Sequence, residues 1–252
     1  MVNFFKKTIF FLFEKYFTKL SFEKKNNYLN KIIEISTNNL SPAEALKLLF
    51  LLDKFIYSKE SIKSIEYGNG IHTKQKHIKY IDFFIKNINE GEKILDIGCG
   101  NGYVDYKIAS KISKIKIIGI DLNKENIEIA NKNHNHSNIN YIYGDALKSL
   151  PDGSFDVIIL SNFLEHIDDR VGFLKLILKK FNPDRILLRV PSFERDWRVP
   201  LMEELNLDYR LDSTHYIEYK KEDYLNELKA AGLTTICNEY KWGEIWSVVV
   251  KS

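Results

Sequence analysis

This sequence has little cysteine, little proline and no long uncharged apolar run. Its 252 residues include only two cysteines, Cys99 and Cys237, and five prolines. Two cysteines provide neither a disulfide framework nor a metal-ligand spacing, so we expect a reducing compartment and no metal site. No uncharged apolar stretch approaches the roughly 20 residues that a membrane-spanning helix needs. These absences exclude a disulfide-stapled domain and an integral membrane protein, and they favour the cytoplasm.

The charges of the chain are unevenly distributed. The net charge is +3, yet residues 1–90 hold 15 Lys or Arg against 9 Asp or Glu, so this third is +6 and the remainder is −3. The basic excess therefore lies in the N-terminal third. A nucleic-acid-binding protein is disfavoured, because the acidic remainder contains no separate basic recognition module.

Residues 1–20 form an amphipathic pattern at helical spacing. At about 100° per residue, one side carries Phe5, Ile9, Leu12, Phe13, Tyr16, Phe17 and Leu20. Such a stripe favours packing against the protein's own body or in a homodimer. The alternative that we keep open is a basic aromatic helix lying peripherally on the inner face of a membrane. Charged residues interrupt the apolar stretch, so a signal peptide is not expected.

Two further helices are predicted in the first third of the chain. Ser41, Pro42 and Glu44 combine a capping box with a proline at the first helical position, so a helix should begin there and run to about Tyr57. A turn and then a second helical pattern over residues 78–88 follow. We expect this helical region to end near residue 90.

From residue 91 the pattern changes to alternating strands and helices. The expected strands are residues 93–97, 115–120, 140–143, 155–161, 185–190, 234–240 and 245–251. Nearly continuous Ile, Leu and Val in most of these runs is typical of strands that are covered on both faces. The sequence therefore predicts an α/β fold with a largely parallel sheet, interrupted by an irregular insert at residues 191–219.

Three strand ends carry residues suited to a ligand. Residues 94–102 end a strand in Gly98, Gly100 and Gly102, with Asp96 two positions before the first glycine. Asp121 follows the second strand and Asp145 the third. Because ligands of open α/β sheets bind beyond the carboxyl ends of the strands, we expect these residues to line one cleft. Any one of the aspartates taken alone could equally be a cap or a turn residue.

Four segments resemble successive motifs of the class I S-adenosylmethionine-dependent methyltransferases. They are Ile-Leu-Asp-Ile-Gly-Cys-Gly-Asn-Gly at 94–102, Ile-Gly-Ile-Asp-Leu at 118–122, Tyr-Gly-Asp-Ala at 143–146 and Asp-Val-Ile-Ile-Leu-Ser-Asn-Phe-Leu-Glu-His at 156–166. The resemblance implies a Rossmann-like, doubly wound, seven-stranded sheet with the last strand antiparallel. It also implies a methyltransferase domain over residues 91–252, preceded by a helical extension and cofactor lid over residues 1–90.

The resemblance further implies S-adenosylmethionine as the cofactor. Residues 98–102 would approach its methionine moiety, Asp121 its ribose, and Asp145 with Ala146 its adenine, which Leu122 would help to sandwich. The implied cofactor residues are Asp96, Gly98, Cys99, Gly100, Gly102, Asp121, Leu122, Asp145, Ala146, Ser161 and Asn162. Ser161 and Asn162 would face the reacting sulfonium.

A nicotinamide- or flavin-dependent dehydrogenase is the main competing interpretation. Such enzymes also combine a glycine turn with an acid after the second strand. Here the glycines follow a Gly-x-Gly-x-Gly spacing, and Asp96 stands just before the turn. A dehydrogenase would also not require Asp145, so a methyltransferase is favoured.

Methyl transfer from a sulfonium is an in-line displacement that depends mainly on alignment and exclusion of water. A base is needed only if the acceptor must lose a proton. His166, after the fourth strand, and His215, in the insert, have side chains suited to that role. For His166, a structural or cofactor-related place at a helix entrance is the alternative.

The insert is the expected substrate cover, because it leaves the fifth strand at the cleft. Its aromatic and guanidinium side chains could contact a sugar or an anionic group, and the substrate candidates are Arg195, Trp197, Arg198, Tyr209 and Arg210. Pairing of Arg195 and Arg198 with Glu194 and Asp196 is equally compatible with the sequence. The insert has seven acids and three arginines, which argues against a phosphate-specific site.

These observations predict O-methylation of a small molecule, a sugar or a surface-glycan or lipid-linked acceptor. The fourth strand ends in Ser-Asn-Phe at residues 161–163 and lacks the acid or amide followed by two prolines and an aromatic residue that marks many nitrogen-directed enzymes. Two alternatives stay open, a cofactor-binding but inactive subunit and a membrane-attached interaction protein.

Overall fold

The computed structural model describes the backbone of residues 2–252 and the side chains from residue 10 onwards. The chain divides into two compact units, Met1–Glu60 and Ser61–Ser252. The division falls inside one helix, α3 (Pro42–Tyr67), rather than near residue 90. Residues 61–90 therefore belong to the same compact unit as the sheet, while the functional division into residues 1–90 and 91–252 stays a prediction.

The first unit consists of α1 (Val2–Thr18), α2 (Phe22–Thr37) and the beginning of α3. The predicted capping box is present, since the Ser41 N–H donates to Glu44 at 3.0 Å, and α3 continues ten residues beyond the expected end. Tyr28 of α2 contacts Phe17 of α1 edge-on and hydrogen-bonds Tyr16 at 3.1 Å. The side chains of Phe5 and Ile9, which belong to the predicted stripe, lie outside the described residues.

Many apolar side chains of this first unit are exposed. They include Phe10, Leu12, Phe13, Phe22, Leu51 and Phe55. Within residues 2–252, no helix is both long enough and apolar enough to cross a bilayer.

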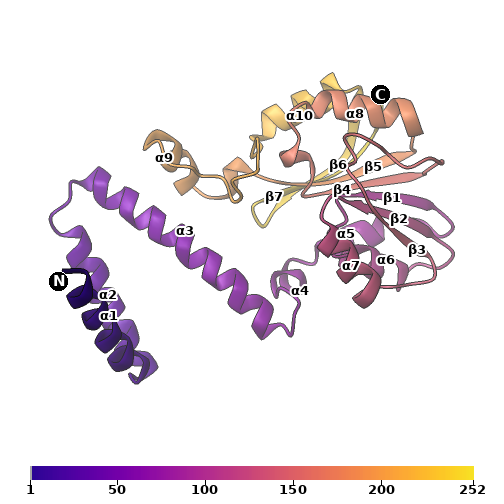
Figure 1. Cartoon of the computed structure of the whole chain (residues 1–252). Helices are drawn as coiled ribbons and strands as arrows, with labels where there is room; N and C mark the ends of the chain where they lie inside the picture. Colours follow the sequence, from indigo (N-terminus) through magenta and orange to yellow (C-terminus); the bar gives the residue numbers. More distant parts are fainter. Residues whose placement is uncertain (1) are drawn as a thin grey trace. The chain divides into compact units, whose positions relative to one another are not determined.

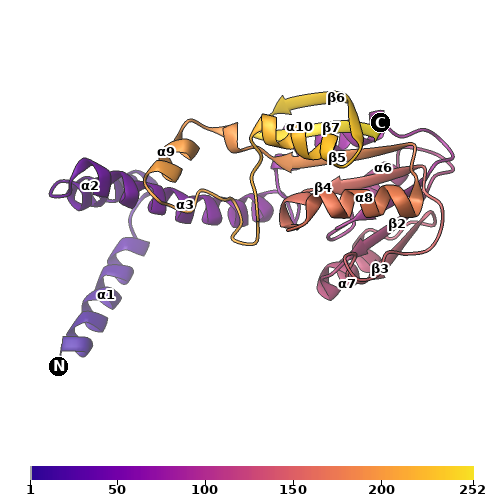
Figure 2. The same cartoon turned by 90° about the horizontal axis from the view of Figure 1, so that it is seen from above.

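The second unit contains a seven-stranded sheet of order β3-β2-β1-β4-β5-β7-β6 (Figures 1 and 2). Its strands are β1 (Lys93–Ile97), β2 (Lys116–Asp121), β3 (Ile139–Tyr143), β4 (Val157–Ser161), β5 (Arg185–Pro191), β6 (Leu233–Lys241) and β7 (Glu244–Lys251). Strands β1 to β5 pair in parallel, whereas β7 is antiparallel to both β5 and β6. The predicted doubly wound sheet with an antiparallel last strand is confirmed.

Helices cover both faces of the sheet, as Figure 1 shows. On one face, α8 (Arg170–Phe181) and α10 (Lys221–Ala230) pack on the core through side chains such as Leu174, Ile177 and Leu228. On the other face, α5 (Tyr80–Lys86) and α6 (Tyr103–Ala109) contribute Phe83, Phe84 and Ile108. Successive strand residues point to opposite faces, so each strand contributes to both layers.

The remaining helices are short. They are α4 (Lys74–Ile78), α7 (Lys124–Asn133), the 3-10 turns η1 (Leu164–His166) and η2 (Phe193–Arg195), and α9 (Arg198–Glu204). The single helical pattern expected over residues 78–88 is divided, because Lys79 adopts a left-handed conformation with φ 52° between α4 and α5. That residue ends one helix and begins the next.

Candidate active site

The glycine loop follows β1 and turns back on itself. Gly98, Gly100 and Gly102 all have positive φ, at 79°, 56° and 75°. A Cβ on Gly98 would lie 2.6 Å from the Phe163 ring, and one on Gly102 would lie 2.5 Å from the Tyr141 ring. A Cβ on Gly100 would meet nothing within 4 Å. The outer two glycines therefore permit close packing, while the middle one leaves open space beside the main chain.

Asp121 joins the ends of β1 and β2. Its Oδ2 accepts a hydrogen bond from the Gly100 N–H at 2.8 Å, and its Oδ1 accepts one from the Asn123 N–H at 2.8 Å. The carboxylate is half-buried, and the next side chain, Leu122, is exposed. The two predicted cofactor elements therefore converge, as the positions of the strand ends require.

Asp145 follows β3 and lies in a turn. Its carboxylate accepts from the Leu147 N–H at 3.0 Å and forms an ion pair with Lys148 at 3.0 Å. Hydrogen bonding to Lys148, followed by that to the Leu147 N–H, lowers the pKa of Asp145. The neighbouring Ala146 is buried. The turn-residue interpretation of Asp145 is therefore realised, and contact with an adenine stays a prediction.

A buried carboxyl pair lies beneath the glycine loop. Asp96 of β1 and Asp105 of α6 are both at most 1% exposed. Burial raises the pKa of Asp96 to about 7, and burial together with the charge of Asp96 raises the pKa of Asp105 further above its ordinary value. Burial therefore favours a state in which the pair retains a proton. Asp105 was not among the predicted site residues, although an acid three positions after the last glycine was a usable signal.

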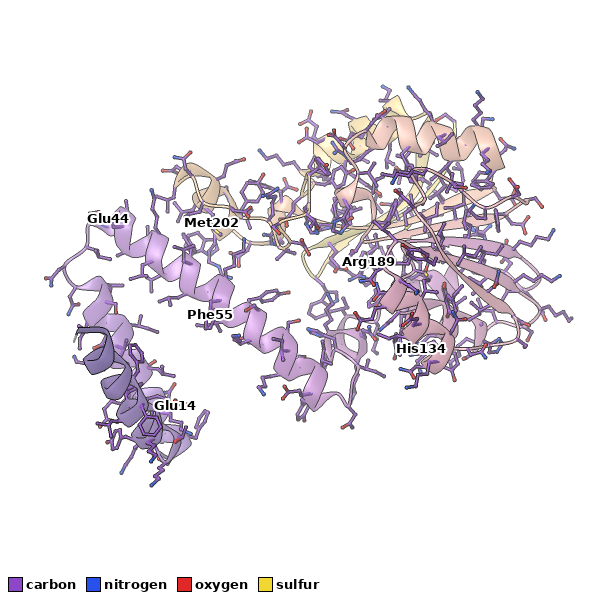
Figure 3. All side chains as sticks on the ribbon, in the orientation of Figure 1. Glu14, Glu44, Phe55, His134, Arg189 and Met202 are labelled. Atoms are coloured by element: carbon purple, nitrogen blue, oxygen red, sulfur yellow. The ribbon has the colours of Figure 1, made fainter. Side chains whose placement is uncertain are left out.

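Ser161 and Asn162 end β4 beside a buried arginine. The Asn162 N–H donates to the Arg189 carbonyl at 2.7 Å, and the Arg189 guanidinium donates to the Ser161 hydroxyl at 3.4 Å. Arg189 (Figure 3) pairs with Glu244 and lies 4.0 Å above the Tyr80 ring centroid. The sequence analysis missed this arginine because it sits in a run of Ile, Leu and Val that predicts only a buried strand.

The insert at residues 191–219 is a loop whose two ends meet. The Tyr219 N–H donates to the Pro191 carbonyl at 3.1 Å, and the Phe193 N–H donates to the Tyr219 carbonyl at 2.9 Å. Inside the loop, the Tyr216 N–H donates to the Glu165 carbonyl at 2.8 Å. The insert is thus fastened both to its own base and to η1.

The predicted substrate residues of the insert have different environments. Arg195 is mostly buried and donates to Glu218 and to the carbonyls of Ser192 and Tyr209, so it pairs with neither Glu194 nor Asp196. Arg198 pairs with Asp196, as the sequence allowed. The remaining three are the exposed Trp197, the half-buried Tyr209 and Arg210, which contacts Asp208 and the His215 carbonyl. Arg195 therefore supports the insert, and its contact with a substrate stays a prediction.

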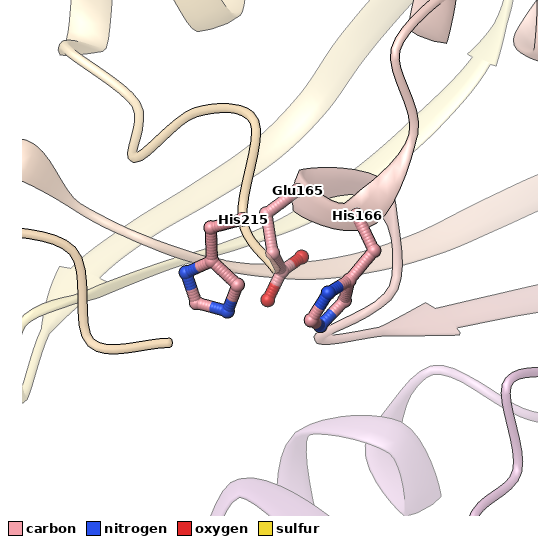
Figure 4. Close-up of side chains that lie close together, drawn as sticks. All are labelled: Glu165, His166 and His215. Atoms are coloured by element: carbon pink, nitrogen blue, oxygen red, sulfur yellow. The ribbon is translucent and has the colours of Figure 1, made fainter. Parts of the chain in front are cut away.

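The two candidate histidines lie together, and a glutamate joins them. The ring centroids of His166 and His215 are 4.7 Å apart in an edge-to-face arrangement. Glu165 places its carboxylate between the two rings (Figure 4), and ligand atoms of all three side chains lie within 4.8 Å of one another. The sequence analysis proposed both histidines but missed Glu165, whose position beside His166 was the available signal.

Burial dominates the electrostatics of this cluster. Glu165 is 1% exposed, and both of its carboxylate oxygens lack a hydrogen-bond partner within the described part of the chain. Burial raises the pKa of Glu165 to about 7. Burial, followed by the nearby His215, lowers the pKa of His166. Burial therefore favours the neutral forms of Glu165 and His166.

A separate hollow lies at the amino ends of the strands. Its lining includes Lys93 and Lys116, the first residues of β1 and β2, together with residues 137–140 and 152–155. The glycine loop, Asp121 and Asp145 are at the opposite edge of the same strands. This hollow is consequently not the predicted cofactor site.

The sheet order, the glycine loop after β1 and the acid after β2 together define a class I S-adenosylmethionine-dependent methyltransferase domain. The family described as "Methyltransferase domain" matches residues 88–232, which is more than half of the chain. The chain belongs to this family.

Relatives of this chain act on different acceptors. It is 27% identical over 166 residues to phosphoethanolamine N-methyltransferase 1 of Arabidopsis thaliana, a match covering 65% of this chain and 33% of that protein. It is 31% identical over 99 residues to a ubiquinone biosynthesis O-methyltransferase of Psychrobacter cryohalolentis, covering 37% of this chain and 38% of that protein. The chain thus matches little more than a third of the length of these curated relatives.

Among solved structures, one similar fold is magnesium protoporphyrin IX methyltransferase of Synechocystis with bound S-adenosylhomocysteine. The TM-score is 0.55 at 14% sequence identity, and the match covers 70% of this chain and 84% of that chain. At this identity the likeness supports the fold alone.

Proposed function

We propose that this chain transfers the methyl group of S-adenosylmethionine to an oxygen atom of a small molecule, a sugar or a surface-glycan or lipid-linked acceptor. The observation that carries the proposal is the bond from the Gly100 N–H to Asp121 at 2.8 Å. This bond joins Gly100, in the loop after β1, to the carboxylate of Asp121 at the end of β2. Binding of an adenosyl group beyond the carboxyl ends of the strands requires these two elements to lie together.

The cofactor residues in this proposal follow the strand ends. The loop of Gly98, Cys99, Gly100 and Gly102, supported by Asp96, would hold the methionine moiety, and Asp121 the ribose hydroxyls. Asp145, Ala146 and Leu122 would surround the adenine, while Ser161 and Asn162 would face the sulfonium. When bound, the cofactor supplies an electrophilic methyl carbon on a positively charged sulfur. Residues 67–77, which include most of α4, would act as a lid over it.

The protein's own task is alignment, exclusion of water and removal of a proton. The insert, held by its hydrogen bonds to β5 and η1, would cover the acceptor. Its predicted contacts with the acceptor are Trp197, Tyr209, Arg198 and Arg210. The low pKa of His166 keeps its imidazole neutral near pH 7, so this residue or His215 could accept the proton of an acceptor hydroxyl.

An oxygen acceptor is supported by the end of β4 and by the charge of the insert. The Ser161-Asn162-Phe163 end lacks the acidic or amide and proline pattern associated with many nitrogen acceptors. Seven acids and three arginines in the insert disfavour nucleic acid.

Residues 1–20 would pack in the protein or a homodimer or contact a membrane, and vesicle cosedimentation with and without them separates these cases.

The cofactor assignment is tested by calorimetric titration with S-adenosylhomocysteine. Asp121→Ala removes a carboxylate whose charge-assisted bonds are worth about 1.5–3 kcal/mol each, so we expect binding to weaken at least about tenfold. Asp152→Ala, a change at an exposed acid near the opposite edge, is the control and should bind as the wild type does. Unchanged affinity in Asp121→Ala would remove the ribose assignment.

The acceptor is tested with radiolabelled S-adenosylmethionine and fractionated cell extract. Label in a small-molecule, glycan or lipid fraction supports the proposal, and label in protein or nucleic acid contradicts it. A chain that binds S-adenosylhomocysteine but labels no fraction would be the cofactor-binding, inactive subunit.

A further inference from the structure

We propose that Glu165, His166 and His215 bind one divalent transition-metal ion. The three side chains come from η1 and from the insert, which the hydrogen bond from Tyr216 to the Glu165 carbonyl holds together. The site lies beyond the carboxyl end of β4, at the edge of the sheet that carries the glycine loop.

The spacing of the ligand atoms suits a single ion. They lie within 4.8 Å of one another, and the Glu165 carboxylate points into the space between the two imidazoles (Figure 4). Ligand atoms on one ion at about 2.1 Å are at most about 4.2 Å apart. A small rotation of these side chains would therefore complete the coordination.

The buried carboxylate of Glu165 is the independent observation that points to a cation. Both of its oxygens are enclosed and have no hydrogen-bond donor among residues 10–252. Buried polar groups are almost always satisfied, and an unsatisfied carboxylate is costly. A metal ion bound to one or both oxygens of the Glu165 carboxylate would supply the missing partner.

Hydrogen bonds leave the same nitrogen of each histidine available. Thr214 donates its hydroxyl proton to Asp212 at 2.7 Å, so at 2.9 Å it can only accept from Nδ1–H of His166. Nδ1–H of His215 faces the carboxylate of Glu218 at 3.4 Å. Both rings are thus oriented with a lone pair on Nε2, by the outer-shell carboxylate and hydroxyl contacts that metal-binding histidines commonly make.

Two imidazoles and one carboxylate select the kind of ion. This donor set suits Mn²⁺, Fe²⁺, Co²⁺ or Zn²⁺, whereas Mg²⁺ and Ca²⁺ prefer oxygen ligands throughout. Three protein ligands leave at least one coordination position open. Cysteine is not involved, which is why a search of the sequence for cysteine spacing predicts no metal.

The open position suggests how the acceptor is activated, a step that rests on the proposed function. A hydroxyl bound to the ion becomes more acidic and releases its proton to solvent. The oxygen lone pair then forms a bond to the methyl carbon as the carbon–sulfur bond breaks, and that electron pair returns to sulfur. In this arrangement the ion replaces the histidine base of the proposed function, and the two histidines hold the ion.

The proposal is tested by titrating the full-length, metal-free protein with Co²⁺ and following its visible absorption bands. We expect one Co²⁺ per chain, bound at least about tenfold more weakly by Glu165→Gln and by His166→Ala. His77→Ala, which removes an exposed histidine outside the cluster, is the matched control and should bind normally. Circular dichroism establishes that each variant is folded.

Thermal unfolding gives a second measurement that does not depend on activity. Co²⁺ should raise the unfolding midpoint of the wild type and of His77→Ala but leave that of Glu165→Gln unchanged. Absence of a Co²⁺ band, or equal bands in wild type and both cluster variants, overturns the proposal. Co²⁺ binding without methyl transfer would contradict the proposed function while leaving the metal site intact.

Discussion

The most unusual residues of the molecule are the acids Asp96 and Asp105, which are buried beneath the glycine loop. A Cβ on Gly119 of β2 would lie 2.7 Å from Asp105 Oδ2 and 2.9 Å from Cys99 Sγ, so the strand leaves room for this carboxyl only because residue 119 is glycine. Burial raises the pKa of both Asp96 and Asp105, so the folded chain favours a state in which the pair retains a proton. This local arrangement makes a prediction about pH.

The contribution of the Asp96–Asp105 pair to stability should fall as the pH rises from about 4 to about 7. The folded pKa of Asp96 is raised to about 7 and that of Asp105 is raised as well, so in this window the folded chain binds more protons than the unfolded chain. Asp105→Asn replaces one carboxyl of the pair with an amide that does not ionise. Relative to this variant, the wild type should lose up to about 1.4 kcal/mol of unfolding free energy per pH unit for each additional proton that its folded state binds. Urea denaturation at a series of pH values measures this loss. Parallel curves of unfolding free energy against pH for the wild type and Asp105→Asn would contradict the retained proton.

The glycines of the loop should divide into two kinds. Gly102→Ala places a Cβ 2.5 Å from the buried Tyr141 at φ 75°, so we expect a loss of about 1–3 kcal/mol of stability from overpacking. Gly100→Ala meets no atom within 4 Å and should cost only about 1 kcal/mol for its left-handed backbone. It should nevertheless weaken binding of S-adenosylhomocysteine. Denaturation and calorimetry separate the effects, and normal binding by Gly100→Ala would argue against the loop as the cofactor cradle.

At the scale of elements, the insert depends on one enclosed ion pair. Glu218 has no exposed side-chain surface, and Arg195 is its cationic partner. The Leu211 N–H and His215 also contact Glu218. The insert is therefore organised around a buried carboxylate, which explains why an irregular, acidic stretch has a defined conformation.

Arg195→Ala should destabilise the protein by about 3–5 kcal/mol, because it leaves Glu218 as an unpaired buried charge. Lys124→Ala, which breaks an exposed pair with Glu128 at 3.8 Å, is the comparison and should cost less than about 1 kcal/mol. Urea denaturation measures both. If Arg195→Ala kept full stability and only raised the KM of the acceptor, Arg195 would be a substrate contact after all.

At the scale of the whole molecule, cofactor binding should reside in the second unit. The core clusters around the sheet contain only residues from 78 onwards, and every proposed cofactor residue lies between residues 96 and 162. Residues 61–252 form a compact unit of their own. We therefore expect a chain lacking residues 1–60 to bind S-adenosylhomocysteine with unchanged affinity in calorimetry. A folded truncated chain that no longer binds would show that the first unit contributes to the site.

Local sequence determined most of the architecture. The sequence predicted all seven strands to within two residues at each end. Most of them are runs rich in Ile, Leu and Val, because strands covered on both faces favour apolar side chains, whereas β3 and β6 are more exposed. The spacing of Gly98, Gly100 and Gly102 identified the loop, and the order of motifs identified the family. Each of these signals lies within a few consecutive residues.

Only the tertiary structure decided which distant side chains meet. Glu165 and His215 are 50 positions apart, and Asp96 lies near Asp105 because α6 packs against β2, the strand beside β1. The partner of Arg195 is Glu218 instead of its neighbours Glu194 or Asp196, since the insert closes on itself. Sequence patterns report which residues are buried and at what period. Contacts across a fold depend on how whole elements pack, and no local pattern carries that information.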